Sequence, residues 1–129
     1  MRSNHQIIAD HYAASARHDL EGMLADLAAD VQWTEMAGSS LGGTYVGRDA
    51  IIANVFVPIG RDWDGYGFEL ERLVDGGETI VALGHYVGRH KASGKRLHAR
   101  VAHVWQLAGG KVRRFEQICD TVLLARAEH

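Results

Sequence analysis

The segment "VAHVWQLAGGKV", from Val101 to Val112, carries the pattern that decides the fold of this chain. Side chains alternate along an extended strand, so Val101, His103 and Trp105 share one face, and the "AGG" sequence that follows allows a tight turn. The next segment, "KVRRFEQIC", alternates in the same way and is expected to return beside the first as a hairpin. A histidine between a valine and a tryptophan is unexpected on a core face, because an aliphatic side chain is buried there at lower cost.

The second half of the chain continues this period-two pattern. Turn sequences "DGG", "KASG" and "AGG" separate the runs, which predicts a meander of hairpin-joined strands. The predicted strands are "FELERLV", "TIVALGHYVGRH", "RLHARVAHVWQL" and "KVRRFEQIC".

The first half has helical spacing instead. Ser3 and Gln6 form a capping box before one helix, and Asp19 is placed to cap a second, short one. A strand, "DVQWTEM", and a glycine-rich loop, "AGSSLGGTYVG", follow. A third helix, "RDAIIANVFV", is expected to end before Pro58.

After the last strand, Asp120 is placed to cap a short final helix. Segregated helices and hairpin-joined strands predict an α+β fold, with helices covering one face of an antiparallel sheet. A length of 129 residues fits one domain, residues 1–129.

Composition excludes several classes of function. The formal net charge is −2 and no basic patch recurs, which argues against a nucleic-acid partner. No apolar run reaches the roughly 20 residues of a membrane span, and the N-terminus lacks the apolar core of a signal peptide. The single cysteine, Cys119, fits a reducing compartment, so we expect a cytoplasmic protein without a membrane partner.

Four polar residues fall on the face of the sheet that is expected to be buried. With Val101, His103 and Trp105 inward, the hairpin brings Phe115, Gln117 and Cys119 to the same face, and the first strand adds Trp33 and Glu35. In the "TIVALGH" strand, the register with His85 inward is the more apolar, although the alternate register of Ile80, Ala82 and Tyr86 is nearly as apolar. Buried polar groups without partners cost about 1–3 kcal/mol each, so Glu35, His85, His103 and Gln117 are expected to serve each other or a ligand.

Three segments resemble the nuclear-transport-factor-2-like superfamily, and within it the SnoaL-like polyketide cyclases and ketosteroid-isomerase-like proteins. These segments are "YAASARHDLEGMLADLAADVQWTEM", "GTYVGRDAI" and "VWQLAGGKVRRFEQICDT". The resemblance covers nearly the whole chain, as one SnoaL-like domain. It implies a curved antiparallel sheet around a conical pocket, closed by three helices from the N-terminal half.

The resemblance also implies functional positions. Glu35 falls where ketosteroid isomerases keep their general base, and His103 falls where they keep an acid that donates to the oxyanion. Tyr12 matches their tyrosine donor if one gap is allowed, and otherwise His11 takes its place. We therefore expect Glu35, His103 and Tyr12 to be catalytic. The residues expected to bind substrate are Trp33, Asn54, His85, Val101, Trp105, Phe115 and Gln117.

The implied activity is an isomerase or cyclase without cofactor that removes a proton next to a carbonyl on a small apolar or polycyclic molecule. The alternative is a ligand-binding or assembly module without chemistry, because a fold does not determine function. Two further hypotheses, an epoxide hydrolase and a metal site, have less support in the sequence. The inward histidine and glutamine depart from the paired aspartates of limonene-type epoxide hydrolases, and a metal site of Glu35, His85 and His103 has no contiguous motif.

The opposite register of the strands also carries apolar side chains. An exposed apolar face usually marks an interface, so we expect a homodimer through the outer face of the sheet. The residues assigned to this face include Ile80, Ala82, Tyr86, Ala102, Val104 and Ile118.

Overall fold

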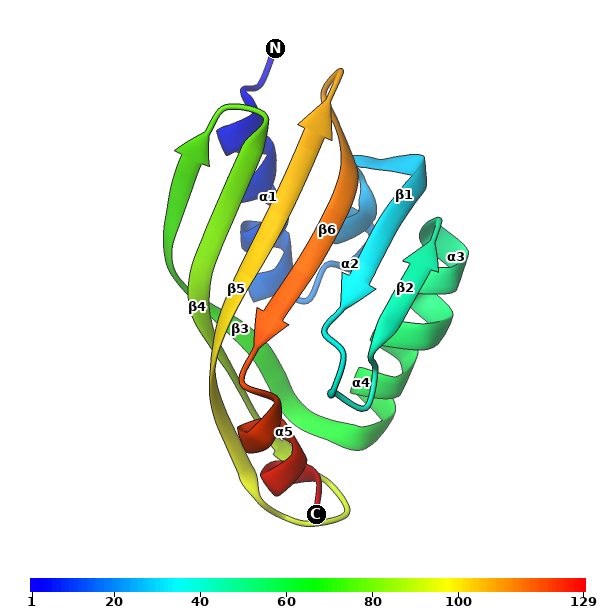
Figure 1. Cartoon of the computed structure of the whole chain (residues 1–129), viewed down its shortest axis with the longest axis vertical. Coiled ribbons are helices and arrows are strands. Elements are labelled where there is room, and N and C mark those ends of the chain that lie inside the picture. Colours follow the sequence, from blue (N-terminus) through cyan, green and yellow to red (C-terminus); the bar gives the residue numbers. More distant parts are fainter.

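The computed structural model describes residues 1–129 and contains a sheet with the strand order β2-β1-β6-β5-β4-β3 (Figure 1). The predicted meander of four long strands is confirmed, and a short strand, β2, lies in the segment expected to be a glycine-rich loop. The strands are β1 (Leu27–Glu35), β2 (Gly43–Val46), β3 (Trp63–Gly76), β4 (Thr79–His90), β5 (Arg96–Ala108) and β6 (Lys111–Cys119).

One strand pair departs from the antiparallel arrangement that the sequence predicted. Strands β1 and β6 run parallel, while all other neighbours in the sheet are antiparallel. No tight turn joins β1 to β6, so hairpin geometry does not set their relative direction. This pair places Trp33 opposite Phe115 in the register.

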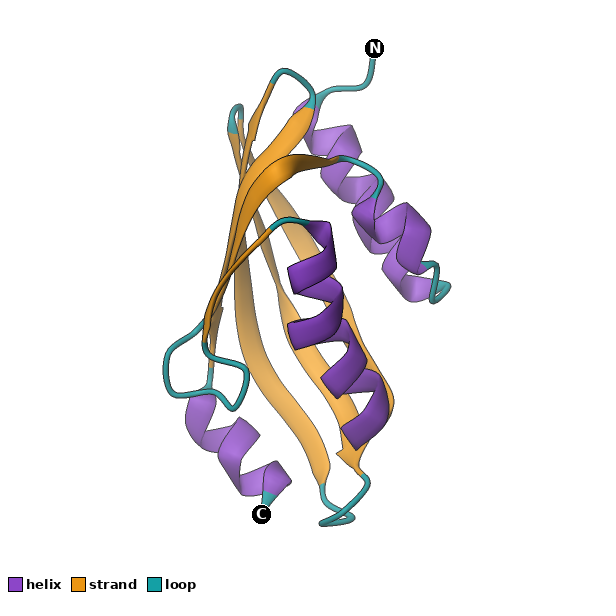
Figure 2. Cartoon of the chain, turned by 90° about the vertical axis from the view of Figure 1, so that its right-hand side faces the viewer, coloured by secondary structure: helices purple, strands orange, loops and turns teal.

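The sheet is curved and stays open (Figure 2). The pairing of β3 with β4 shifts twice, between Asp64 and Gly67 and again between Leu70 and Arg72. Extra residues in one strand of a pair bend that strand and increase its twist. The curvature gives the sheet a concave face, and the helices of the N-terminal half lie against this face (Figure 2).

Helices α1 (Asn4–Ala16) and α2 (Leu20–Leu24) begin where the sequence predicted. The Ser3 hydroxyl accepts a hydrogen bond from the Gln6 amide, and the Asp19 carboxylate accepts one from the Gly22 amide. Each cap satisfies a backbone N–H that has no partner within the helix.

The third helix is longer than predicted and passes through Pro58. It consists of α3 (Arg48–Ile51), a wider π-type turn η1 (Ile52–Phe56) and α4 (Val57–Asp62). The Val57 amide bonds to the Ile52 carbonyl, five residues back. A wider turn tolerates the missing N–H and the bulky ring of proline, which would break a regular α-helix.

Helix α5 (Thr121–Glu128) also covers the concave face, so four helical units pack there rather than the three expected. Asp120 caps it as predicted, with its carboxylate accepting from the Leu123 amide. The helix packs Leu124 and Ala127 against β4 and β5 in a small cluster at the lower end of the sheet. The larger core lies above it, between the sheet and α1 and α3.

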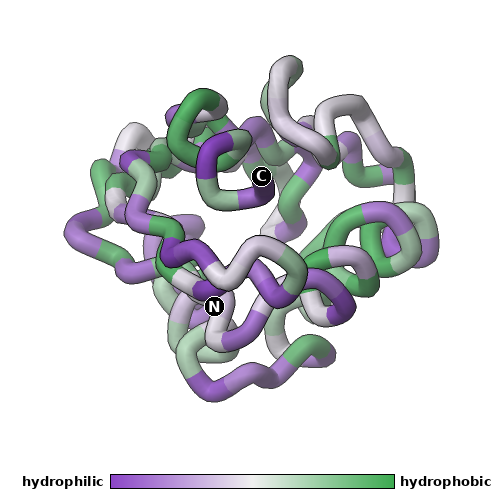
Figure 3. The backbone as a smooth tube through the Cα atoms, turned by 90° about the horizontal axis from the view of Figure 1, so that it is seen from below, coloured by the Kyte–Doolittle hydropathy of each residue, from purple (hydrophilic) through white to green (hydrophobic).

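No helix is long and apolar enough to cross a membrane. Viewed along the long axis, hydrophobic and hydrophilic segments alternate around the molecule (Figure 3).

Candidate functional site

A cavity of about 450 Å³ lies between the concave face of the sheet and the helices. Hydrophobic side chains form most of its wall, which suits an apolar ligand with a few polar groups. Residues from α1, α2, η1, α4 and five strands contribute. They include Tyr12, Trp33, Glu35, Phe56, Trp63, Tyr66, Phe68, Tyr86, His103 and Phe115.

Glu35, the last residue of β1, lines this cavity and is only 3 % exposed. Its Oε2 atom is buried and has no hydrogen-bond partner in the protein. Burial raises the pKa of the Glu35 carboxyl to about 7, because the charged form loses its hydration. A carboxyl with this pKa is well placed to accept and release a proton near neutral pH.

Trp33, two residues earlier on the same face of β1, provides a second unsatisfied polar atom. Its indole Nε1 is buried without a partner. The ring stacks on Phe115, with centroids 3.8 Å apart, and both rings line the cavity. A buried donor without a partner is costly, so this N–H would be stabilised by an acceptor brought within its reach.

His103 also faces the cavity, held between two tyrosine hydroxyls. The Tyr12 hydroxyl lies 2.6 Å from His103 Nδ1, and the Tyr86 hydroxyl lies 2.7 Å from His103 Nε2. The Phe68 ring stacks on the imidazole, with centroids 4.5 Å apart. His103 therefore has no free ring nitrogen with which to contact a ligand directly.

Two further side chains complete this relay. The Trp105 indole donates to the Tyr12 hydroxyl at 2.9 Å, and the Gln117 amide nitrogen donates to the Tyr86 hydroxyl at 2.7 Å. We call the chain of Trp105, Tyr12, His103, Tyr86 and Gln117 the tyrosine–histidine relay.

The relay groups are neutral at ordinary pH. Burial holds the pKa of His103 well below its usual value, and the neighbouring His11 lowers it further. Burial also raises the pKa of both Tyr12 and Tyr86 above that of a free phenol.

The structure decides between Tyr12 and His11 as the partner of His103. Both are buried and line the cavity, but the His11 ring nitrogen Nδ1 lies 3.0 Å from the Met23 carbonyl, which binds it to the next helix. Of these two residues, only Tyr12 bonds to His103. Burial lowers the pKa of His11 to about 4, consistent with a neutral structural histidine.

His85 lies on the outer face of the sheet, so its predicted inward register is wrong. The strand instead turns Ile80, Ala82 and Tyr86 inward. His85 stacks on His98, with ring centroids 4.4 Å apart. It therefore cannot bind a ligand in the cavity, nor join Glu35 and His103 at a metal.

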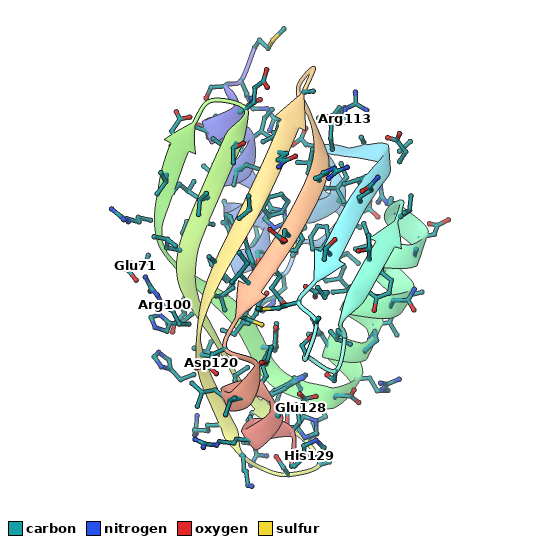
Figure 4. The ribbon with its side chains drawn as sticks, viewed as in Figure 1. Glu71, Arg100, Arg113, Asp120, Glu128 and His129 are labelled. Carbon is teal, nitrogen blue, oxygen red and sulfur yellow. The ribbon has the colours of Figure 1, made fainter.

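The outer face near His85 is charged. Arg100, the partner of His85 in the β4–β5 register, forms an ion pair with Glu71 at the edge of the sheet (Figure 4). No group of three or more His, Cys, Asp and Glu side chains is arranged to hold a metal ion.

Three more predicted substrate-binding residues do not reach the cavity wall. Asn54 is exposed on the helix and donates to the Ala50 carbonyl, and Val101 packs in the lower core. Trp105 is fully buried behind Tyr12. Position in the sequence does not show how deep a side chain lies, so these three assignments failed.

Gln117 is buried as predicted, but on a smaller neighbouring cavity of about 40 Å³ that it shares with Glu35 and Tyr66. Its Oε1 accepts from the Met36 amide at 3.2 Å. The amide therefore connects the end of β1 to the relay.

Tyr66, Phe68 and Tyr86 are wall residues that sequence reasoning missed. Tyr66 lies outside the predicted strand "FELERLV", the inner face of that strand was not assigned, and the strand that contains Tyr86 had two registers that were almost equally apolar. Tyr86 carried a usable signal, because a buried tyrosine hydroxyl needs a partner and His103 on the next strand supplies one.

The arrangement as a whole is a curved, unclosed sheet that encloses an aromatic cavity with helices, which is the architecture of the NTF2-like α+β folds. A family model for the SnoaL-like domain matches residues 8–115. The chain therefore belongs to the SnoaL-like domain family of this superfamily.

Solved structures agree with this assignment. An NTF2-like protein from Burkholderia thailandensis is 50% identical, with a TM-score of 0.97, and the match covers 100% of this chain and 99% of the other. An NTF2-like protein of unknown function from Burkholderia pseudomallei is 32% identical, with a TM-score of 0.89 and 98% of each chain covered. TerC, co-crystallised with polyporic acid, is 26% identical, with a TM-score of 0.85 and 97% of each chain covered. No curated protein matches the chain at a significant level.

Proposed function

We propose that this protein binds a flat, apolar ring compound with an ionisable oxygen or carbonyl, and that Glu35 removes a proton next to that carbonyl. The observation that carries the proposal is the Glu35 carboxyl, which lines an aromatic cavity, has an unpartnered oxygen and a pKa of about 7. A structural carboxylate at this depth would be paired, because an unpaired buried charge is costly.

The residues around Glu35 supply the rest of the reaction. Removing a proton next to a carbonyl moves negative charge onto the carbonyl oxygen, and a fixed hydrogen-bond donor stabilises that charge. Tyr12, His103 and Tyr86 of the tyrosine–histidine relay line the same cavity and offer such a donor. Isomerisation, aldol-type cyclisation and dehydration share this first step, without a cofactor.

The aromatic residues of the cavity wall favour a ligand that consists of flat rings. Trp33 and Phe115 stack face to face on one side, and Phe56 and Phe68 line other parts of the wall. Flat aromatic surfaces bind flat ring systems through a large apolar contact area. Polyporic acid, the compound present in the TerC crystals, is therefore a reasonable first ligand to test.

Proton exchange tests the proposal. The wild-type protein is incubated in D₂O with a panel of cyclic ketones, and deuterium uptake next to the carbonyl is followed by mass spectrometry. Glu35→Gln should lower the rate about 100-fold to 10,000-fold, because glutamine keeps the shape but accepts no proton. The matched control is Glu78→Gln, which alters an exposed carboxylate in the turn between β3 and β4 and should leave the rate unchanged.

Ligand binding is measured in the same samples. Exchange that survives Glu35→Gln would show that the base lies elsewhere. Tight binding of ring compounds without any exchange would contradict the enzymatic part and favour a binding module of the same fold.

A further inference from the structure

The number of protons in the tyrosine–histidine relay determines which of its groups can donate a hydrogen bond to a ligand. The donor and the acceptor are fixed in the hydrogen bonds at both ends of the relay. The Trp105 indole can only donate, so the Tyr12 oxygen accepts there. Gln117 Oε1 accepts from the Met36 amide, which turns its NH₂ group toward the Tyr86 oxygen.

At the centre of the relay, the two tyrosine hydroxyls and the imidazole carry one more proton than the two hydrogen bonds of His103 require. His103 is 5 % exposed and no carboxylate contacts it, so it is neutral and carries one ring proton. One ring nitrogen then donates to a tyrosine, and the other accepts from the second tyrosine. The hydroxyl proton of the tyrosine that accepts from His103 is left without a use in the relay.

The surroundings of the two hydroxyls differ. The Tyr12 side chain lies among the rings of His11, Phe68 and Trp105, and its hydroxyl bonds only to Trp105 and His103. A spare O–H directed at these rings would lose a hydrogen bond, at a cost of about 1–3 kcal/mol.

Tyr86 instead lies at the polar end of the cavity. Its hydroxyl bonds to Gln117, whose amide reaches the backbone next to Glu35. The Tyr66 ring lies 5.2 Å from the Tyr86 ring, and Tyr66 lines both cavities together with Glu35. A spare O–H on Tyr86 therefore has polar neighbours, with the Tyr66 side chain within hydrogen-bonding reach, beside the part of the cavity that Glu35 lines.

We propose that the Tyr86 hydroxyl, and not the His103 imidazole, donates the hydrogen bond to the ligand oxygen, and that His103 is a positioning residue in its Nε2–H tautomer. Tyr12 then donates to His103 Nδ1, and Nε2–H donates to the Tyr86 oxygen. The ligand contact rests on the function proposed above, whereas the tautomer is a property of the protein alone.

The tautomer is tested first, without any ligand. Long-range ¹H–¹⁵N NMR of the histidine side chains distinguishes a ring nitrogen that bears a proton from one that accepts. We expect His103 to show a protonated Nε2 and an unprotonated Nδ1. The Nδ1–H tautomer would overturn the proposal, because the spare proton would then belong to Tyr12.

The ligand contact is tested with naphthols of graded acidity as probes, in a Glu35→Gln background so that no carboxylate repels the naphtholate. Their affinity should rise with their acidity, because a more acidic probe presents more anion to the donor. Tyr86→Phe should lower affinity about 10-fold to 100-fold and flatten this dependence, since a hydrogen bond to a charged group contributes about 1.5–3 kcal/mol. Tyr12→Phe removes the other candidate hydroxyl and should retain the dependence on acidity, because Tyr86 still supplies the donor.

The outcomes separate the two proposals. Loss of the acidity dependence in Tyr12→Phe, with Tyr86→Phe unchanged, would overturn the assignment of the donor. If no naphthol binds to the protein, the proposed ligand class is wrong, while the NMR result still decides which tyrosine holds the spare proton.

Discussion

Glu35 illustrates how a single buried carboxyl links stability to function. Its folded-state pKa of about 7 exceeds the reference value of 4.5, so the folded protein binds this proton more tightly than the unfolded chain does. The stability that protonation provides is complete below pH 4.5 and is lost as the pH rises through 7. The buried carboxyl therefore lowers the stability of the fold at and above neutral pH, where it loses its proton. A purely structural role would not require a residue with this effect.

We therefore expect Glu35→Gln to stabilise the protein at pH 8 by up to about 3 kcal/mol, and to have little effect at pH 4.5. Urea unfolding followed by tryptophan fluorescence at both pH values measures this difference. Glu78→Gln, an exposed control in the turn between β3 and β4, should show a much smaller change between the two pH values. An equal stability of wild type and Glu35→Gln at pH 8 would mean that the carboxyl is solvated.

The pair of strands β3 and β4 is the element that shapes the cavity wall. At Gly84 in β4, an added Cβ would lie 2.2 Å from the Glu69 carbonyl oxygen and 2.8 Å from the Phe68 ring. Phe68 in turn stacks on His103. A glycine is needed here because the neighbouring strand and the ring approach so closely.

Gly84→Ala should therefore destabilise the fold by about 1–3 kcal/mol or more, and weaken ligand binding by displacing Phe68. The matched control is Gly60→Ala in α4, where nothing lies within 4 Å of the added Cβ. The control should stabilise by about 0.5–1 kcal/mol, since alanine favours a helix. Thermal unfolding of both variants compares them, and a stable Gly84→Ala protein would show that β3 can move away.

At the scale of the whole molecule, the outer face of the sheet differs from the one expected. Ile80, Ala82 and Tyr86 are buried in the core, so they cannot form an interface. The outer face instead carries an apolar group of Val81, Leu83, Ala102, Val104 and Ile118, and Ile118 is 43 % exposed.

Charges of both signs surround this apolar group, with Glu69, Glu71 and Glu116 near Arg72, Arg100 and Arg114. A two-fold axis through this face would bury the apolar centre of both copies, and the presence of both signs of charge around it allows opposite charges to pair, so we expect a second copy of the chain as the partner.

We accordingly expect a homodimer, with a mass of twice 14.2 kDa by light scattering at micromolar concentration. Ile118→Asp should produce the monomer, because an unpaired charge in an apolar interface is costly. Val57→Asp, at an exposed position on the helical side, should leave the mass unchanged. A monomer mass for the wild-type chain would contradict the prediction.

The local pattern of the chain was sufficient for the helix caps and for the inner faces of β1, β5 and β6. Ser3, Asp19 and Asp120 cap helices as predicted, because a cap depends on residues three positions apart. Glu35, His103 and Gln117 are buried as predicted, because only one register of those strands is apolar enough to face a core. The order of the elements and the family assignment follow from the same local signals.

Contacts between distant segments decided the rest. The register of β4 depends on its pairing with β5, in which Ala82 lies opposite His103, and its two faces were too similar for local pattern to choose between them. Tyr12 and Tyr86 meet His103 across 91 and 17 residues of sequence. Only the folded chain brings these groups within hydrogen-bonding distance and removes water from Glu35, because both effects depend on how curved strands and helices pack together.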